Sequence, residues 1–381
     1  MMHMLMNVMT GLTVLTLSLA CAPRTHADEP KDHADVLLSK QAGPLRIGII
    51  GMDHGHIEGL LWNATHRDDM VIVGISEPNR ALFDRLAAKY ILEASLYYAT
   101  TEAMLNATKP EAVSVMGPIS GHRAAVEACA ARGVHTLLEK PLAYSSEDAK
   151  AIQEAARAHK VLVLTNFETS WYASVREAKR LADSGEHGTL RKMIFRHGHK
   201  GPKEIGCSAE FLAWLTDPTK NGGGAIVDFG CYGAVIATWM MDGTRPSSIK
   251  ASATTLKPAA YPHVDDDATI VLTYPGKETR VGATAVIEAS WAWTHDNKEM
   301  DLYLDGWSLH AGKWDDLAMR QENAGPTKVQ PAAKPKNLEN EWSYLKAVVR
   351  GECAVDPLSS LEYNVVVAEI LDEARRQVQP K

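Results

Sequence analysis

The sequence predicts an α/β protein of two domains: a doubly wound parallel sheet flanked by helices, followed by an α+β domain with a large, mostly antiparallel sheet. From Leu45 to residue 165, short β-branched runs alternate with helical stretches, which is typical of a parallel sheet. After Gly188, strand-like runs follow one another without long helices between them, which indicates antiparallel pairing. The 381 residues are enough for two or three such cores.

The first domain is expected to alternate strands and helices in a regular order. The expected strands are LRIGII, MVIVGIS, AVSVM, HTLLE and VLVLT. The expected helices between them are residues 56–65, RALFDRLAAKY, HRAAVEACAARG and SSEDAKAIQEAARAHK. Gly133 stands where a glycine commonly ends a helix. This order predicts a Rossmann-like domain over residues 45–165.

The second domain, residues 166–381, is predicted from a change of periodicity. After a helix through VREAKRLADSG, the strand-like runs are RKMIFRHGH, SSIKASATTL, ATIVLTYP, TRVGATAVIEASW and EMDLYLDG. Their alternation of apolar and polar residues is typical of strands with one buried face. Two helical patterns close the chain, around LENEWSYLKAVVRG and SSLEYNVVVAEILDEARRQV.

Composition and charge narrow the class of protein. Apolar residues make up 45% and charged residues 23% of the chain, which excludes a collagen, a coiled coil or a mostly disordered chain. The net charge of −7 argues against a dedicated nucleic-acid binder, because contact with phosphates needs a basic surface. The five cysteines form no CxxC pair, so neither a zinc ribbon nor a disulfide scaffold is indicated.

The first residues differ in kind from the rest. Residues 12–20 form an apolar run, LTVLTLSLA, of signal-peptide length and too short to cross a bilayer. We predict a signal peptide or lipoprotein signal over residues 1–27 and a polar linker over 28–44, and hence an exported protein that is periplasmic or lipid-anchored. Membrane attachment is expected only if Cys21 is lipidated. The alternative is a misassigned start codon followed by a disordered tail.

A turn with glycines follows the first strand. Gly48 and Gly51 precede Asp53 and His54 in the stretch GIIGMDHGH. Glycines at such a junction let the backbone approach a pyrophosphate at a helix N-terminus. The match to G-x-G-x-x-G is imperfect, because Asp53 and His56 stand in its second and third glycine positions. The alternatives are that Asp53 caps the helix, and that the glycines serve packing alone.

Glu77 ends the second strand. A carboxylate at this distance from the turn hydrogen-bonds the ribose of a bound dinucleotide. Together with the turn, Glu77 predicts NAD or NADP as the cofactor and favours NAD. Ser76 and Arg80 keep NADP open, because an arginine there can accept a 2′-phosphate.

The tripeptide Glu139-Lys140-Pro141 follows the apolar run HTLL. A lysine at the carboxyl edge of a central strand lies where open α/β sheets bind ligands. Such a lysine can polarise an oxygen or lower the pKa of a neighbour. Taken alone, three residues are weak evidence, because a surface lysine beside a glutamate is usually just a solvated pair.

Residues 222–241, GGGAIVDFGCYGAVIATWMM, combine glycines with an apolar helical run. Asp228 and Tyr232 are four residues apart, so we expect them to project from one face of a single helix. Burying a carboxylate and a phenol there is costly unless they are paired or used. The alternative is that Asp228 bonds to the backbone and Tyr232 packs in the core.

These three segments, in this order and spacing, resemble the Gfo/Idh/MocA oxidoreductase family. The resemblance runs from about Leu45 to about Arg376 and rests on E-K-P at residues 139–141 and on G-G-G-x-x-x-D-x-G-x-H/Y from Gly222 to Tyr232. It implies an NAD(P)-dependent oxidoreductase that acts on a sugar or glycoside hydroxyl. It also implies a second domain that binds the substrate and pairs with another subunit, so a homo-oligomer is expected.

The resemblance places Lys140 and Asp228 in the reaction centre. We assign Tyr232 as the proton acceptor, Lys140 as the cation that lowers its pKa, and Asp228 as the group that orients Lys140 or the substrate. The residues assigned to the cofactor are Gly48, Gly51, Asp53, His54, Glu77, His122, Glu139 and Lys140. The residues assigned to the substrate are Asn166 and His199.

We expect no metal site. Two histidine pairs, at positions 54 and 56 and at 197 and 199, each lack the further ligands that zinc needs. The acidic run at residues 265–267 lacks the ligand spacing of an EF-hand.

Export and a dinucleotide fold together restrict the reaction. No nicotinamide pool replenishes an enzyme outside the cytoplasm, so we expect the cofactor to be held tightly through the cycle. Either one sugar is oxidised while another is reduced, or a glycoside is oxidised, cleaved by elimination and reduced again, which amounts to hydrolysis. A third route is a dehydrogenase with a separate electron acceptor, and a non-catalytic dinucleotide-binding protein is also consistent with the sequence.

Overall fold

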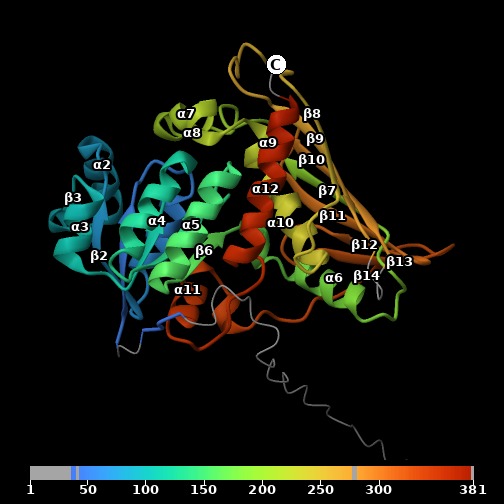
Figure 1. The fold of residues 1–381 in the computed structure, drawn as a ribbon, viewed down its shortest axis with the longest axis horizontal. Helices are drawn as coiled ribbons and strands as arrows, with labels where there is room; N and C mark the ends of the chain where they lie inside the picture. The colour runs from blue at the N-terminus through green and yellow to red at the C-terminus, as the bar shows by residue number, and fades with distance from the viewer. Residues whose placement is uncertain (1–35, 40–42, 277–280, 379–381) are drawn as a thin grey trace, which may run out of the picture.

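The computed structural model describes residues 36–39, 43–276 and 281–378. The predicted signal over residues 1–27, with Cys21, lies outside these ranges, as does most of the predicted linker. Export and lipidation therefore stay predictions. The described chain forms two α/β units on either side of the long helix α12 (Leu361–Val378) (Figure 1).

The first unit is a six-stranded sheet of order β3-β2-β1-β4-β5-β6. Its strands are β1 (Leu45–Ile50), β2 (Met70–Ser76), β3 (Tyr97–Tyr98), β4 (Ala112–Val115), β5 (His135–Glu139) and β6 (Val163–Asn166). Its helices are α1 (Ile57–Thr65), α2 (Arg80–Tyr90), α3 (Thr101–Thr108), α4 (His122–Ala130) and α5 (Ser146–His159). All pairs are parallel, which confirms the Rossmann-like sheet. The strand order reverses between β1 and β4, where such sheets bind ligands.

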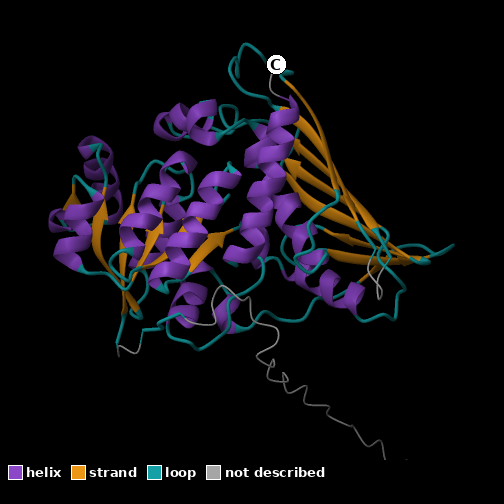
Figure 2. Cartoon of the chain, viewed as in Figure 1, coloured by secondary structure: helices purple, strands orange, loops and turns teal. Residues whose placement is uncertain are grey.

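The second unit is an eight-stranded sheet of order β14-β13-β12-β11-β7-β10-β9-β8, in which only β7 and β10 pair in parallel among the described strands. Its strands are β7 (Lys192–Gly198), β8 (Ser248–Thr254), β9 (Asp267–Tyr274), β10 (Ala283–Ser290), β11 (Asn297–Leu304), β12 (Trp307–Ala311), β13 (Leu317–Gln321) and β14 (Thr327–Lys328). Its helices are α6 (Ala173–Asp183), α7 (Ala209–Leu215), α8 (Pro218–Asn221), α9 (Ala225–Asp228) and α10 (Gly230–Met240). Helices α10 and α12 pack along one face of this sheet (Figure 2). The large, mostly antiparallel sheet is thereby confirmed.

The last two helices hold the units together. In α12, Val365 belongs to a core shared with α4 and α5, while Leu371 belongs to the core of the second unit. Helix α11 (Glu341–Val349) packs against the first unit, where Trp342 and Leu345 join the side chains of β1. Helices α11 and α12 come late in the chain and yet pack against the first unit, because an apolar helix face pairs with the core that covers it and not with its neighbour in sequence.

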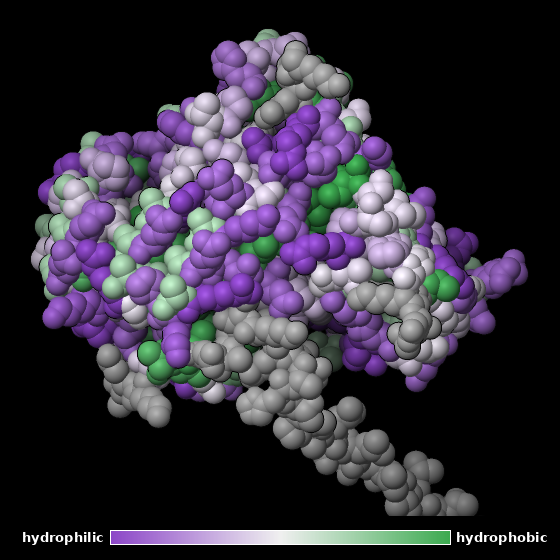
Figure 3. All heavy atoms as spheres, viewed as in Figure 1, coloured by the Kyte–Doolittle hydropathy of each residue, from purple (hydrophilic) through white to green (hydrophobic). Residues whose placement is uncertain are grey.

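Polar side chains cover most of the face shown in Figure 3. In the part of the chain that the structure describes, no single helix has the length and apolar character of a membrane span. One bent pair, Pro218–Asp228 with Gly230–Met240, meets that criterion by length and composition together.

Candidate active site

A cavity of about 340 Å³ lies at the carboxyl edge of the parallel sheet, where the two units meet. It is lined by Lys140 directly after β5, by Asp228 and Tyr232 from α9 and α10, by His199 after β7 and by Lys298 on β11. The predicted catalytic residues therefore face one space. A larger groove of about 760 Å³, lined from α6, α10 and α12, contains none of the predicted site residues.

Lys140 and Asp228 form a buried ion pair. Lys140 Nζ donates hydrogen bonds to Asp228 Oδ1 and, at 3.0 Å, to the backbone oxygen of Asp228. Asp228 Oδ2 accepts a further hydrogen bond from Trp291 Nε1 at 2.9 Å. Burial alone would raise the pKa of Asp228, but the charge and hydrogen bond of Lys140 lower it to about 2. Burial opposes the charge of Lys140 as well, yet Asp228 raises the lysine pKa above its ordinary value, so both groups are charged at neutral pH.

Tyr232 lies beside this pair. Lys140 Nζ is 5.2 Å and Lys298 Nζ is 5.3 Å from the centre of the Tyr232 ring. The predicted lowering of the Tyr232 pKa by Lys140 is wrong, because burial and then the charge of Glu168 raise that pKa well above 10. The reason is that Asp228 already neutralises Lys140 while other carboxylates surround the phenol. Among the described groups, the surroundings of Tyr232 therefore favour the phenol over the phenolate.

The single helix predicted across Asp228 and Tyr232 is broken between them. Helix α9 ends at Asp228, α10 begins at Gly230, and the flanking helical segments meet at 61°. Close packing positions the first of these: a Cβ on Gly224 would lie 1.7 Å from the backbone oxygen of Asp265. The Asp265 carboxylate also accepts two backbone N–H groups at the start of α9, at 2.8 and 2.7 Å. The glycine motif thus docks the start of α9 onto the loop before β9.

A second ion pair borders the cavity, and no sequence signal predicts it. Lys298 pairs with Glu168 in the 3-10 turn η5 (Glu168–Trp171) that follows β6. Glu168 Oε1 also accepts a hydrogen bond from Tyr172 OH at 2.5 Å. A lone lysine in an alternating strand has the pattern of an exposed residue, so only the fold reveals its place.

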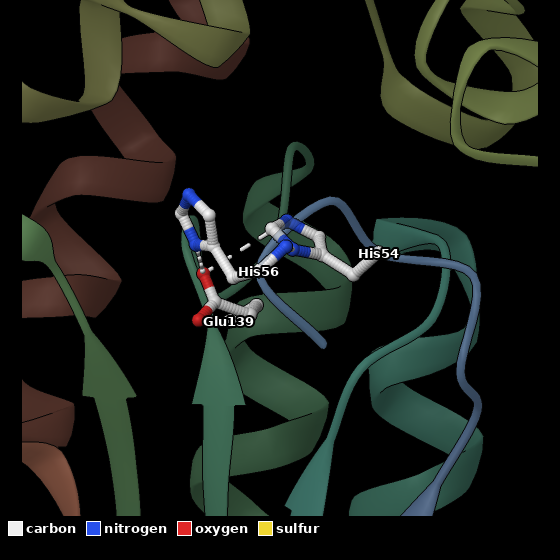
Figure 4. Close-up of side chains that lie close together, drawn as sticks. All are labelled: His54, His56 and Glu139. Carbon is white, nitrogen blue, oxygen red and sulfur yellow. Dashed lines mark hydrogen bonds and ion pairs between the residues drawn. The ribbon is translucent and has the colours of Figure 1, made fainter. Parts of the chain in front are cut away.

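Glu139 contacts two histidines at the end of β5 (Figure 4). Its Oε2 atom lies 3.1 Å from His56 Nδ1 and 3.8 Å from His54 Nε2. Its Oε1 atom accepts a hydrogen bond from Asn166 Nδ2 at 2.9 Å. Burial alone would raise the pKa of Glu139, but the neighbouring histidines and Asn166 hold it well below its usual range. Glu139 is therefore an ionised, acceptor-only group.

The ligand atoms of His54, His56 and Glu139 lie within 4.8 Å of one another, close enough to surround a metal ion. The hydrogen bonds favour another role. His54 Nδ1 accepts the backbone N–H of His56 at 3.1 Å, so the neutral His54 ring carries its proton on Nε2, the atom that faces Glu139. A nitrogen that binds a metal must have lost its proton. The three residues therefore fit a hydrogen-bonded group better than a metal site.

The other predicted site residues are spread over different places. His199 lines the 340 Å³ cavity. Asn166 lines a second cavity, of about 370 Å³, which shares Gly55 and His56 with the first. His122 lines neither: it is 1% exposed, and its Nδ1 lies 3.1 Å from a backbone oxygen in the loop after β5. The ring of His122 thus contacts the loop after β5, and its assignment to the cofactor stays a prediction.

The two glycines assigned to the cofactor have different surroundings. Gly48 lies inside β1, where a Cβ would be 3.1 Å from Met104 of α3. Gly48 thus packs closely against α3, and its assignment to the cofactor stays a prediction. Gly51 follows β1 with a φ of +78°, and a Cβ there would lie 3.0 Å from the backbone nitrogen of Gly117. Only Gly51 thus brings the turn close to the loop after β4, at the point where the strand order reverses.

The turn after Gly51 differs from a glycine-rich phosphate loop. Within residues 52–56, backbone N–H groups already donate to Glu77 Oε2 at 2.7 Å, to a backbone oxygen at 3.0 Å and to His54 Nδ1 at 3.1 Å. Asp53 has one carboxylate oxygen buried without a hydrogen-bond partner. Burial, and then the charge of Glu77, raise the pKa of Asp53 to about 7.

Two features at this edge of the sheet lie where dinucleotide-binding folds hold their cofactor. Glu77, at the end of β2, stands where such folds bind the adenosine ribose. The cavity beside Lys140 has the volume of a small-molecule site. In the turn between these two features, Asp53 and His56 stand where a phosphate loop has glycines. Side chains and not bare backbone therefore lie between Glu77 and the cavity.

Comparisons with known proteins agree with this geometry. Residues 45–167 match the oxidoreductase family with an NAD-binding Rossmann fold, and residues 175–308 match the GFO/IDH/MocA C-terminal domain. A trans-1,2-dihydrobenzene-1,2-diol dehydrogenase from Xenopus tropicalis is 22% identical over 263 residues, which cover 68% of this chain and 75% of the relative. A D-glucoside 3-dehydrogenase from Escherichia coli (strain K12) is 24% identical over 212 residues, which cover 55% of this chain and 58% of the relative.

Solved structures share the fold. The crystal structure of an inositol dehydrogenase homolog from Azotobacter vinelandii, complexed with NAD+, has a TM-score of 0.74 at 19% identity and covers 89% of this chain and 96% of that one. The two family matches follow each other along the chain and together include both sheets up to β11. The chain therefore belongs to the Gfo/Idh/MocA family of NAD(P)-binding oxidoreductases.

Proposed function

We propose that the protein transfers hydride between a hydroxyl-bearing carbon of a sugar or glycoside and a nicotinamide dinucleotide, NAD or NADP. The observation that carries this proposal is the convergence of the Lys140–Asp228 ion pair and the Tyr232 phenol in one cavity. Oxidation of an alcohol needs donors that stabilise charge on its oxygen and a group that takes its proton.

The residues of this chain have separable tasks in that reaction. Asp228 holds the Lys140 ammonium, which stabilises the negative charge that develops on the substrate oxygen. Tyr232 hydrogen-bonds the substrate hydroxyl, and its assignment as the proton acceptor stays a prediction. Glu77 would hold the adenosine ribose, with Glu139 and Lys140 at the other end of the dinucleotide. When bound, that dinucleotide accepts or supplies the hydride.

The lining of the two cavities supports a polyhydroxyl substrate. Lys298 borders the first cavity, and Asn166, Glu168, Trp171 and Trp314 line the second. Fixed polar groups beside aromatic faces are the means by which pockets orient small polar ligands. The relatives described as a diol dehydrogenase and a glucoside dehydrogenase support the same class of substrate.

The test has two steps. Natively purified protein is denatured and any released dinucleotide is identified by mass spectrometry, which also examines the predicted tight binding. The protein is then mixed with NAD or NADP and a panel of aldoses, alkyl glycosides and cyclic polyols, and nicotinamide absorbance is followed. We expect reduction of the cofactor with at least one sugar. Absence of dinucleotide binding, or binding without turnover of any panel member, would contradict the proposal.

We expect NAD to bind at least about tenfold more tightly than NADP, which corresponds to about 1.4 kcal/mol. The acidic group Glu77 follows β2, where a 2′-phosphate would bind, and its charge also acts on Asp53. Arg80, the nearest cation in sequence, is paired with Asp84 at 2.8 Å and lies 4.4 Å from the centre of the Tyr97 ring. Isothermal titration of both dinucleotides measures the preference, and Glu77→Gln should narrow it. Equal or tighter binding of NADP by the wild-type protein would refute this expectation.

A further inference from the structure

Lys298 is a lysine on the buried face of the large sheet. Side chains alternate along a strand, so Lys298 projects from the same face of β11 as Met300 and Leu302, which are both buried. The Lys298 side chain is only 10% exposed, and it lines the 340 Å³ cavity together with Lys140 and Tyr232. Lysine is rarely buried unless its charge is paired or used. Its position therefore indicates a task for the ammonium in this cavity.

The ion pair with Glu168 uses only part of the hydrogen-bonding capacity of Lys298. An ammonium group has three N–H donors. Within the described part of the chain, Lys298 Nζ donates one hydrogen bond, to Glu168 Oε2, so two donors remain. A buried donor without an acceptor costs free energy. These two N–H groups are therefore available to a ligand that enters the cavity.

Two neighbouring groups offer further donors to the same cavity. Lys140 Nζ donates to the carboxylate and to the backbone oxygen of Asp228, which leaves one N–H. His199 Nδ1 accepts the backbone N–H of Gly201 at 2.9 Å, so the neutral ring carries its proton on Nε2. Burial lowers the pKa of His199 and keeps the ring neutral, and the charge of Lys298 also acts on it. The cavity therefore presents unused N–H donors from three side chains.

The carboxylates that line this cavity are already engaged. Asp228 accepts hydrogen bonds from Lys140 and Trp291. Asp296, the other carboxylate among the described lining residues, pairs with Lys313. A sugar hydroxyl both donates and accepts hydrogen bonds, whereas a carboxylate only accepts them. A cavity with unused donors and engaged carboxylates therefore fits a ligand carboxylate better than one more hydroxyl.

A second carboxylate beside Lys298 is compatible with its pairing to Glu168. One lysine can hold two carboxylates, as Lys179 in α6 does: its Nζ lies 2.5 Å from Asp183 and 3.0 Å from Asp242. In the pair near the reaction centre, Lys298 lines the first cavity and Glu168 lines the second. A ligand carboxylate in the first cavity therefore meets the ammonium side of this pair.

We propose that Lys298 determines the specificity of the substrate site by binding a carboxylate of the substrate. The preferred substrate is then a sugar acid, such as a uronic acid or its glycoside, whose reacting hydroxyl lies beside Lys140 and Tyr232. Lys140 Nζ and Lys298 Nζ lie 5.2 and 5.3 Å from the centre of the Tyr232 ring, so both cations border the space beside one phenol. This assignment rests on the proposed function and names the substrate class within it.

The first experiment compares each neutral sugar with the acid of the same ring. The pairs are glucose with glucuronate, galactose with galacturonate, and the methyl glycosides of each, all at pH 7 with the dinucleotide that the protein binds. We expect kcat/KM for at least one acid to exceed that for its neutral partner by about tenfold or more, because a hydrogen bond to a charged acceptor is the stronger one. If every neutral sugar is used at least as efficiently as its acid, the proposal is wrong.

The second experiment removes the ammonium. The double variant with Lys298→Met and Glu168→Gln loses both charges, so no buried charge is left unpaired, and circular dichroism checks its fold. For the preferred acid, kcat/KM should fall by about 10- to 100-fold, mainly through KM. For the neutral partner it should change much less. Glu168→Gln alone keeps the ammonium and should keep the preference for the acid. Lys192→Met is the matched control, since Lys192 is an exposed lysine of the same sheet, and it should change neither value.

The outcomes separate this proposal from the proposed function. Equal losses for the acid and its neutral partner in the double variant would show that the ion pair only supports the fold, and would overturn the role of Lys298. A preference for the acid that survives the loss of Lys298 would overturn it as well. Failure of the wild-type protein to bind a dinucleotide, or to oxidise any sugar or sugar acid, would instead refute the proposed function, and the role of Lys298 with it.

Discussion

Lys140→Met is expected to lower both the activity and the stability of the protein. The substitution leaves the Asp228 charge buried with Trp291 as its remaining side-chain hydrogen-bond donor, which should lower the free energy of unfolding by about 3–5 kcal/mol. It also removes the cation that stabilises the substrate oxygen, so kcat/KM should fall by about 10²–10³-fold. Chemical denaturation and steady-state kinetics measure the two effects.

The double variant with Lys140→Met and Asp228→Asn separates these effects. With both charges removed, most of the lost stability should return, because the large penalty comes from leaving one charge unpaired. Activity should stay as low as in Lys140→Met, since the cation is still missing. Recovery of activity in the double variant, or unchanged kcat/KM in Lys140→Met, would show that the ion pair is not part of the reaction centre.

Gly224→Ala is expected to cause the largest loss of stability among single glycine substitutions in the α9 motif. The added Cβ would lie 1.7 Å from the backbone oxygen of Asp265, and backbone cannot swing aside as the end of a flexible side chain can. Helix α9 must then move away from Asp265, whose carboxylate accepts the backbone N–H groups at the start of the helix. The free energy of unfolding should therefore fall by about 3–5 kcal/mol. Urea denaturation followed by circular dichroism measures this change.

Gly59→Ala is the control for that experiment. Gly59 is exposed in α1, and a Cβ there meets nothing within 4 Å. Alanine favours the helix, so the free energy of unfolding should rise by up to about 1 kcal/mol. If the protein tolerated both substitutions equally, close packing at the start of α9 would not be what the glycine motif provides.

Periodicity predicts most of the elements that position the site. Strands β1 and β2 coincide with the expected runs LRIGII and MVIVGIS, and alternation predicts the strands of the large sheet because side chains alternate between its faces. The two-residue strands β3 and β14 and the helix break at Phe229 are not predictable in this way. Strands of two residues, or a single turn residue between two helices, leave no periodic trace in the sequence.

The site residues also fall into two groups: those that a sequence motif predicts and those that only the folded chain reveals. Motifs predict Lys140 and Asp228, and the fold brings them together. The pair Lys298–Glu168 and the contact of His56 with Glu139 have no local signal, because their partners are 130 and 83 residues apart in the sequence. Such contacts become visible only when the chain is folded.

By itself, the sequence determined the class of fold, the order of its elements and the residue types at the ends of β5 and α9, because these follow from local backbone preferences and from motifs. Only the tertiary structure decided which groups surround them: that Lys140 pairs with Asp228, and that burial and Glu168 raise the pKa of Tyr232. The physical reason is that an ion pair or a pKa depends on charges, burial and hydrogen bonds within a few ångströms, and distant segments supply these on folding.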